Sequence, residues 1–453
     1  MLISTNPATG VEIARYSFTE PDQVGQLLNA AYTASHDWRR RTVNERGELM
    51  MQIAALLRER RDDAARMMSL EMGKPITQAY AEVEKCAACC EYFANHAAAM
   101  LATEHIVTQY SSSYIVYQPL GVVFGIMPWN FPFWQVFRAA VPALMAGNTM
   151  IMKHSPEVTG SAMLIDAVMR DAGLPDGVFG VVRADIPAAH DIIADKRVAA
   201  VTFTGSTRGG IAVAQTAAAY CKPSVLELGG SDAYIVCDDA DIPLAARLCA
   251  EARLVNSGQS CVAAKRFLVH ESVAGEFTRC FVEEVSAKRI GDPLDPATQI
   301  GPLARLDLRA ALQHQTDATI AQGATVALAG GSMNGAGAFF SPVVLTNVQP
   351  AMTAAREELF GPVAPVIHIS SDDEAIGIAN ASDYGLGAAV FTSDARRGER
   401  IALALDAGFC AVNDFVKSDP RLPFGGVKLS GWGRELSAVG IREFVNVKTV
   451  VSV

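Results

Sequence analysis

The sequence lacks the features that would tie it to nucleic acid, to a membrane or to export. Its 453 residues carry a net charge of −10 without a basic stripe, so we expect no nucleic-acid partner. The longest apolar runs are broken well before the roughly 18 residues that a membrane span needs. The first residues, MLISTNPATGVEIARY, lack the basic and then apolar build of a signal peptide.

Cysteine is also sparse. The nine cysteines are an odd set without the spacing of a disulfide framework, which indicates a reducing compartment, and we expect a cytoplasmic protein. Cys86, Cys89 and Cys90 lie close together, but no second cluster of Cys or His completes four metal ligands. We therefore expect no metal site and a helix-packing role for these three thiols.

What the sequence does contain is an alternation of strand and helix patterns after a helical N-terminal part. Residues 21–35 and 43–103 carry apolar residues at helical spacing. Strand patterns then alternate with helices twice, over residues 121–237 and again over 242–413. This alternation predicts an α/β fold with two parallel-sheet units. Residues 105–118 and 443–453 are strand-like and isolated, so they are expected to pair with each other or with another subunit.

Cys261 ends a polar, glycine-containing run, NSGQSC at 256–261, between a predicted helix (242–255) and a predicted strand (265–270). A cysteine on such a turn can point into a cleft, where its thiolate could act as a nucleophile. The alternative is a buried structural thiol, which is the commoner fate of a free cysteine.

Three other runs have possible roles in chemistry. FTGSTRGG at 203–210 follows a strand and opens a helix, which is the setting of an anion site, although a plain turn and cap explains it equally well. In PWNFP at 128–132, two prolines present Asn130, either as an oxyanion donor or as an N-cap. Glu227 ends a strand among leucines, where a carboxylate with a raised pKa could act as a base.

Taken together, six motifs resemble those of the NAD(P)-dependent aldehyde dehydrogenase superfamily, in the same order: PWNFP (128–132), FTGS (203–206), ELGG (227–230), GQSC (258–261), EELFGP (357–362) and PFGGVKLSGWGRE (423–435). The resemblance implies two Rossmann-like domains and a β-strand oligomerisation arm. The expected segments are a cofactor-binding domain (1–104 and 123–228), a catalytic domain (229–424) and oligomerisation segments (105–122 and 425–453). A homodimer or homotetramer is expected.

The resemblance implies a role for each catalytic residue. Cys261 is the nucleophile that forms a thiohemiacetal and then a thioester. The side chain of Asn130 and the backbone N–H of Cys261 hold the oxyanion. Glu227 activates the water that hydrolyses the thioester. For NAD or NADP, the implied binding residues are Trp129, Lys153, Ser155, Gly205, Ser206, Leu228, Glu358 and Phe360.

The chain departs from the family pattern at the adenosine ribose. The usual Lys-x-x-Glu is replaced here by Lys153 followed by His154, Ser155 and Pro156, so the ribose carboxylate is missing at residue 156. A carboxylate at that place would repel the 2′-phosphate of NADP. The sequence therefore leaves the choice between NAD and NADP open.

The substrate is suggested by the helix after PWNFP. Phe131, Gln135 and Arg138 are spaced to share one helix face, which lines the aldehyde tunnel in the family. A guanidinium there suits a substrate carboxylate, and Lys417 and Ser418 lie in a loop that reaches the tunnel mouth in the family. This pattern is most like bacterial succinate-semialdehyde dehydrogenases. The alternative for Arg138 is a surface or helix-pairing role.

Four other functions remain as alternatives. A broad aliphatic or aromatic aldehyde dehydrogenase has the same fold. Acyl transfer to coenzyme A is disfavoured by Glu227, because only hydrolysis needs a base. A non-catalytic scaffold conflicts with the presence of Cys261, Glu227 and Asn130 together. A cysteine hydrolase would need a histidine partner, and none of the eight histidines lies in a suitable motif.

Overall fold

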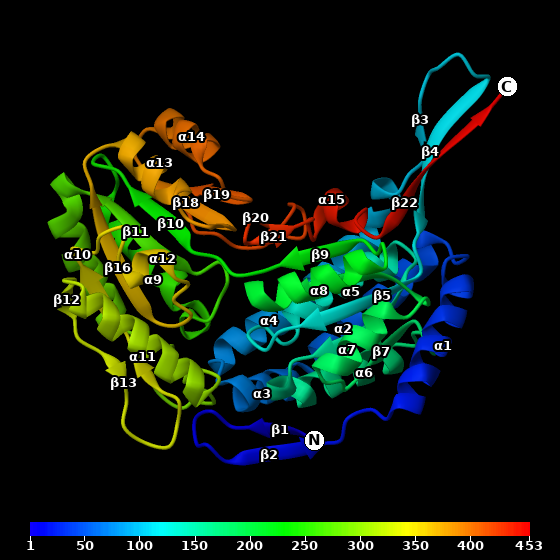
Figure 1. Cartoon of the computed structure of the whole chain (residues 1–453), viewed down its shortest axis with the longest axis horizontal. Coiled ribbons are helices and arrows are strands. Elements are labelled where there is room, and N and C mark those ends of the chain that lie inside the picture. Colours follow the sequence, from blue (N-terminus) through cyan, green and yellow to red (C-terminus); the bar gives the residue numbers. More distant parts are fainter.

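The first α/β unit is built on a six-stranded sheet (Figure 1). The structure is a computed structural model that describes residues 1–453. The strands lie in the order β21 (Gly431–Trp432), β9 (Ser224–Glu227), β8 (Val198–Thr204), β5 (Val122–Met127), β6 (Thr149–His154) and β7 (Phe179–Val181). All pairs are parallel except β21 with β9. This is the doubly wound order, in which ligands bind where the chain reverses direction across the sheet, here between β5 and β8.

Helices cover this sheet and form the N-terminal part of the chain. They are α1 (Pro21–Trp38), α2 (Val43–Glu59), α3 (Arg61–Met72), α4 (Ile76–Met100), α5 (Trp134–Met145), α6 (Thr159–Asp171), α7 (Ile186–Ala194) and α8 (Thr207–Ala219). The predicted helical stretch 43–103 is three helices, because Gly73 adopts a left-handed conformation (φ 79°) at the end of α3 and Pro75 follows it. An unpredicted hairpin, β1 (Leu2–Thr5) with β2 (Glu12–Tyr16), precedes α1.

A seven-stranded sheet carries the second unit, and Figure 1 shows it beside the first. Its order is β12 (Thr325–Leu328), β15 (Val343–Thr346), β16 (Val363–Ile369), β11 (Ala264–His270), β10 (Asp232–Val236), β18 (Gly387–Phe391) and β19 (Phe409–Val412). Its main helices are α9 (Ile242–Leu254), α10 (Glu271–Ser286), α11 (Leu306–Ala321), α13 (Asp372–Asn380) and α14 (Ala395–Ala404). The predicted α/β class with two parallel-sheet units is thus confirmed, whereas β15 was not predicted.

An arm of three strands projects from the first unit (Figure 1). The C-terminal β22 (Val445–Ser452) pairs along its whole length with β4 (Ser112–Pro119), which also pairs with β3 (Glu104–His105). The two isolated strand patterns therefore do pair with each other. Not all of residues 425–453 belongs to this arm, because β20 (Val427–Lys428) pairs with β17 (Tyr384–Gly385) and β21 joins the first sheet.

The helix α4 is the centre of the first unit's largest core. Cys86, Cys89 and Cys90 are fully buried there and lie among the apolar side chains of α5. Burial raises the pKa of each of these thiols, which keeps them neutral. No helix of the chain combines the length and the apolar character needed to cross a bilayer.

Candidate active site

A cavity of about 420 Å³ lies at the carboxyl ends of β5, β6, β8 and β9, at the switch point of the first sheet. This volume is in the range of small-molecule sites. The second unit contributes Cys261, Glu358 and Phe360 to the lining. The predicted site residues that line it are Trp129, Asn130, Gln135, Lys153, Ser155, Gly205, Ser206, Leu228, Cys261, Glu358 and Phe360. Glu227, Phe131, Arg138, Lys417 and Ser418 are not part of this lining.

The turn before Cys261 is held in an unusual backbone conformation. Asn256, Ser257 and Gly258 all have positive φ angles, of 52°, 57° and 80°. A Cβ on Gly258 would lie only 2.4 Å from the carbonyl carbon of Gly361, so no other residue fits there. Such conformations persist only where the surrounding structure enforces them. Here they turn the chain from α9 towards the cavity and place Cys261 at its wall.

Two hydrogen-bond donors are available beside the thiol. The Nδ2 of Asn130 donates one hydrogen to the carbonyl of Gln259 (3.1 Å), which leaves its second hydrogen free. Asn256 Nδ2 in turn donates to the carbonyl of Asn130 (2.7 Å) and fixes the Asn130 backbone. The backbone N–H of Cys261 donates to no group of the chain. The site therefore holds preorganised donors of the kind that stabilise a developing oxyanion.

Burial raises the pKa of the Cys261 thiol to about 11, although the charges of Arg138 and Lys265 favour the thiolate. The thiol is therefore mainly protonated at neutral pH and needs a base to release its reactivity.

We expect the rate at which iodoacetamide alkylates Cys261 to rise about tenfold per pH unit between pH 7 and 9, because only the thiolate reacts. Mass spectrometry of the modified peptide measures this rate, with Cys261→Ala as the background. A rate that levels off near pH 7 to 8 would contradict the raised pKa.

Glu227 lies at the end of β9, behind the cavity wall. Its side chain is buried and neither carboxyl oxygen has a hydrogen-bond partner. Burial raises the pKa of Glu227 well above its ordinary value, against the opposing charge of Arg138, while Glu435 raises it further. Once ionised, an unpaired carboxylate at this place can take a proton and return it, as a general base requires, and the raised pKa makes it a stronger base than an exposed glutamate.

Arg138 does not line the cavity, although its charge acts on both Cys261 and Glu227. The guanidinium is buried, forms an ion pair with Glu435 and covers the ring of Phe424 at 4.6 Å. Its Nη2 also donates to the hydroxyl of Thr204 (3.4 Å). The charge of Arg138 is therefore already matched by a buried carboxylate, which lies between β21 and α15 (Ser437–Ile441) and not on a helix. Sequence spacing could not reveal that partner, which comes from the last motif of the chain.

We expect Arg138→Met to destabilise the fold by about 3–5 kcal/mol, because it leaves the buried Glu435 without its cation. The thermal unfolding midpoint measures this loss. The double variant Arg138→Met/Glu435→Met should recover most of it. A midpoint for Arg138→Met close to that of the unchanged protein would contradict this account.

The far end of the cavity is polar. Lys153 on β6 is half-buried, and burial lowers its pKa although Glu157 opposes this shift. The hydroxyl of Ser155 donates to Glu157, and Glu157 also pairs with Arg305 (2.6 Å). Ser206 lines the cavity and caps α8, accepting from the N–H of Gly209 (3.3 Å). The predicted cap at the start of α8 is therefore present. The N-terminus of this helix also faces the cavity, where its backbone N–H groups favour a bound anion.

Glu358 is held at the opposite wall. It accepts a hydrogen bond from the N–H of Gly230 (3.1 Å) and pairs with Lys265 (2.9 Å), which also donates to the carbonyl of Cys261 (2.6 Å). A Cβ on Gly229 would lie 2.5 Å from the Glu358 carboxylate, so the glycine makes room for it. Sequence reasoning missed Lys265, although it follows Cys261 by only four residues.

The expected substrate residues are dispersed. Of the predicted helix face, only Gln135 lines the cavity, while the ring of Phe131 lies 3.8 Å from the Lys74 ammonium. Lys417 is exposed and pairs with Asp414 (2.8 Å). Ser418 accepts hydrogen bonds from Lys85 (2.7 Å) and from the indole of Trp134 (3.1 Å). Neither Lys85 nor Trp134 lies in a motif, so sequence reasoning did not find them.

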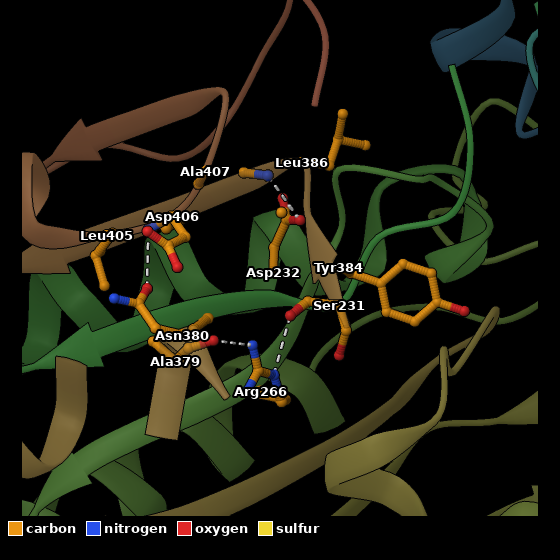
Figure 2. Close-up of a pocket in the computed structure, with 14 residues that line it drawn as sticks. Ser231, Asp232, Arg266, Ala379, Asn380, Tyr384, Leu386, Leu405, Asp406 and Ala407 are labelled. Carbon is orange, nitrogen blue, oxygen red and sulfur yellow. Dashed lines mark hydrogen bonds between the residues drawn. The ribbon is translucent and has the colours of Figure 1, made fainter. Parts of the chain in front are cut away.

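A second hollow lies at the amino ends of β10 and β18 (Figure 2). Asp232 accepts there from the N–H of Gly387 (3.0 Å), and Arg266 donates to the carbonyls of Ser231, Ile378 and Ala379. The hollow encloses about 10 Å³, which is room for about one water molecule. It therefore serves packing between strands and cannot hold a substrate.

The fold and the cavity define a class of enzyme, and the comparisons with known proteins agree. A family model described as the aldehyde dehydrogenase family matches residues 2–450, and the chain belongs to this family. It is 46% identical to the succinate semialdehyde dehydrogenase (NAD(P)+) Sad of Escherichia coli strain K12, over 99% of this chain and 97% of that protein. It is 44% identical to a probable succinate-semialdehyde dehydrogenase (NADP(+)) of Synechocystis, over 99% of both.

Among solved structures, the succinic semialdehyde dehydrogenase from Streptococcus pyogenes in complex with NADP+ has a TM-score of 0.97 at 33% identity, over 99% of both chains. The family and the fold indicated by the six sequence motifs are thus confirmed.

Proposed function

We propose that the protein oxidises succinate semialdehyde to succinate with NAD+ or NADP+. The observation that carries this proposal is the convergence of Cys261, Asn130 and Glu227 at one cavity, in a chain whose full-length relatives are named for this activity. The balanced reaction consumes one aldehyde, one NAD(P)+ and one water, and yields the carboxylate, NAD(P)H and two protons.

The chain's own residues account for the covalent steps. The Cys261 thiol releases its proton to solvent, and its sulfur attacks the aldehyde carbon. The free hydrogen of Asn130 Nδ2 and the Cys261 N–H stabilise the oxyanion of the resulting thiohemiacetal. When bound, the nicotinamide accepts the hydride that converts this adduct to a thioester. Glu227 then takes a proton from water, which attacks the thioester carbon and releases the Cys261 thiol and the acid.

The cavity fits the cofactor. The N-terminus of α8 at Ser206, with Gly205, suits a pyrophosphate. In this proposal Lys153 and Ser155, which line the cavity, would bind the adenosine ribose, and Glu358 would bind the nicotinamide ribose. Trp129 and Phe360, whose ring centroids are 5.7 Å apart, and Leu228 would supply apolar contacts to the ring systems of the cofactor.

Pro156 is the position that should govern cofactor choice. We expect Pro156→Glu to lower kcat/KM for NADP+ about tenfold and to leave that for NAD+ nearly unchanged, because a carboxylate next to Ser155 repels the 2′-phosphate. Initial rates with both cofactors measure the ratio, and Pro156→Gln is the control for size. Equal losses with both cofactors would contradict this role.

The substrate is tested by measuring NADH or NADPH formation at 340 nm with succinate semialdehyde and with neutral aldehydes of similar length. A higher kcat/KM for succinate semialdehyde supports the proposal. The alternative, a broad aliphatic or aromatic aldehyde dehydrogenase, is the conclusion if neutral aldehydes are oxidised equally well or better.

The same proposal assigns roles to the parts of the chain. Residues 1–104 and 123–228 bind the cofactor, and residues 229–424 supply the nucleophile. Residues 105–122 and 425–453, which include the paired β4 and β22, mediate a homodimer or homotetramer. All nine cysteines are free, which is consistent with the cytoplasm as the compartment. Light scattering of the purified protein tests the assembly.

A further inference from the structure

Lys85 on α4 is a largely enclosed cation without a carboxylate partner. Other cations of this region are matched: Lys74 pairs with Glu82, Lys265 with Glu358, and Arg138 with Glu435. Lys85 forms no ion pair. Its ammonium lies 4.3 Å from the centroid of the Trp134 ring, and its one hydrogen bond goes to the hydroxyl of Ser418 (2.7 Å). Burial lowers its pKa to about 8, and the nearby charge of Arg138 acts in the same direction. An enclosed ammonium of this kind lacks the anion that would stabilise it.

Apart from the face of the Trp134 ring, the polar groups around Lys85 offer hydrogens, and an acceptor is missing. The ammonium has three hydrogens and uses one on Ser418. The hydroxyl of Ser418 accepts from both Lys85 and the Trp134 indole (3.1 Å) and donates to no group of the chain. Its own hydrogen is therefore free. Two ammonium hydrogens and one hydroxyl hydrogen are thus available to a ligand with several acceptor oxygens, such as a carboxylate.

This cluster adjoins α5, the helix that contributes Gln135 to the lining of the reaction cavity. Glu82, one turn before Lys85 on α4, accepts the backbone N–H groups of Phe133 and Trp134 (both 2.9 Å) and so binds α4 to the first turn of α5. Trp134 is followed directly by Gln135, whose side chain lines the cavity that contains Cys261. Ser418 lies in the loop between β19 and β20, so this loop provides the third member of the cluster.

We propose that Lys85, together with the hydroxyl of Ser418, binds the carboxylate at the far end of an ω-carboxylated aldehyde. This inference rests on the proposed function and replaces Arg138 as the residue that recognises the carboxylate. Lys85 thereby acts as a specificity-determining residue, because its ammonium stabilises the bound form of a negatively charged substrate. The indole N–H of Trp134 holds the Ser418 hydroxyl in position. A neutral aldehyde would leave these donors without a partner.

The test compares Lys85→Met with the unchanged enzyme on succinate semialdehyde and on its neutral methyl ester, methyl 4-oxobutanoate. The expected result is a fall of about 10- to 100-fold in kcat/KM for the acid, mainly through KM, and a change below about twofold for the ester. Lys85→Arg should retain much of the preference. The matched control is Lys196→Met, an exposed lysine after α7 that does not line the cavity, and it should behave like the unchanged enzyme.

A binding measurement without turnover gives a second readout. Succinate should protect Cys261 from iodoacetamide in the unchanged enzyme, and about tenfold more succinate should be needed with Lys85→Met. If Lys85→Met does not fold, Lys85→Gln serves in its place. The inference is overturned if these variants keep the preference for the acid, or lose acid and ester alike. If the unchanged enzyme shows no preference for the acid, the proposed substrate is wrong, and this carboxylate site with it.

Discussion

Cys261→Ala should lower the rate of aldehyde oxidation by at least about 10⁴-fold and still bind the cofactor. The physical reason is that no other thiol lines the cavity, so the covalent adduct cannot form. Asn130 and the backbone donors would remain in place, but they stabilise an oxyanion only after a nucleophile has attacked. Steady-state NAD(P)H formation measures the loss, and fluorescence titration with the cofactor measures binding.

The control for this variant is Cys249→Ala on α9, a fully buried cysteine in the core of the second unit. It should keep the catalytic rate and lose only some stability, because a buried thiol acts as a small apolar group. If Cys261→Ala retained full turnover, the covalent mechanism would be refuted. The family fold would then have to support a direct hydride transfer from a hydrated aldehyde.

Glu227→Gln should slow hydrolysis of the thioester without slowing the formation of the thioester and NAD(P)H. We expect a rapid burst of about one NAD(P)H per site, followed by a steady state slowed about 10²- to 10³-fold. The amide keeps the size of the side chain but cannot take a proton from water, so the thioester on Cys261 accumulates. Stopped-flow absorbance at 340 nm measures the burst, and mass spectrometry of acid-quenched enzyme detects the acyl group on Cys261.

The same experiment shows whether the acyl group is transferred to water or to coenzyme A. Adding coenzyme A to Glu227→Gln should not restore the rate if the enzyme is a hydrolase, whereas recovery would indicate acyl transfer. Glu399→Gln, an exposed glutamate on α14, is the matched control and should show no burst. If Glu227→Gln slowed the burst and the steady state equally, Glu227 would act before the thioester and not as the base for water.

The raised pKa of Glu227 adds a pH dependence to this prediction. Because burial favours its neutral form, the folded carboxyl binds a proton that an exposed glutamate would have lost. Deacylation, which needs the ionised form, should therefore accelerate as pH rises from 6 to 9 in the unchanged enzyme. The same rise should be absent from the slow steady state of Glu227→Gln.

The sequence was sufficient to predict those features of the protein that depend on neighbouring residues. Apolar periodicity and turn residues predicted both α/β units, and strand patterns at 105–118 and 443–453 predicted the arm that β4 and β22 form. These features can be predicted because each depends on residues that are close together in the sequence. The six motifs likewise marked Cys261, Asn130 and Glu358, since each lies on a turn at the end of a strand or helix.

Only the tertiary structure showed which charged side chains form ion pairs with each other. Arg138 and Glu435 are separated by almost 300 residues, and Lys85 and Ser418 by 333, so no local pattern connects them. A buried cation binds substrate only if no carboxylate of the protein already neutralises it, and that depends on the packing of distant segments. The sequence alone thus marked Cys261 as the proposed nucleophile and Asn130 as the proposed oxyanion donor. The three-dimensional fold paired Arg138 with Glu435 and left Lys85 without a carboxylate partner.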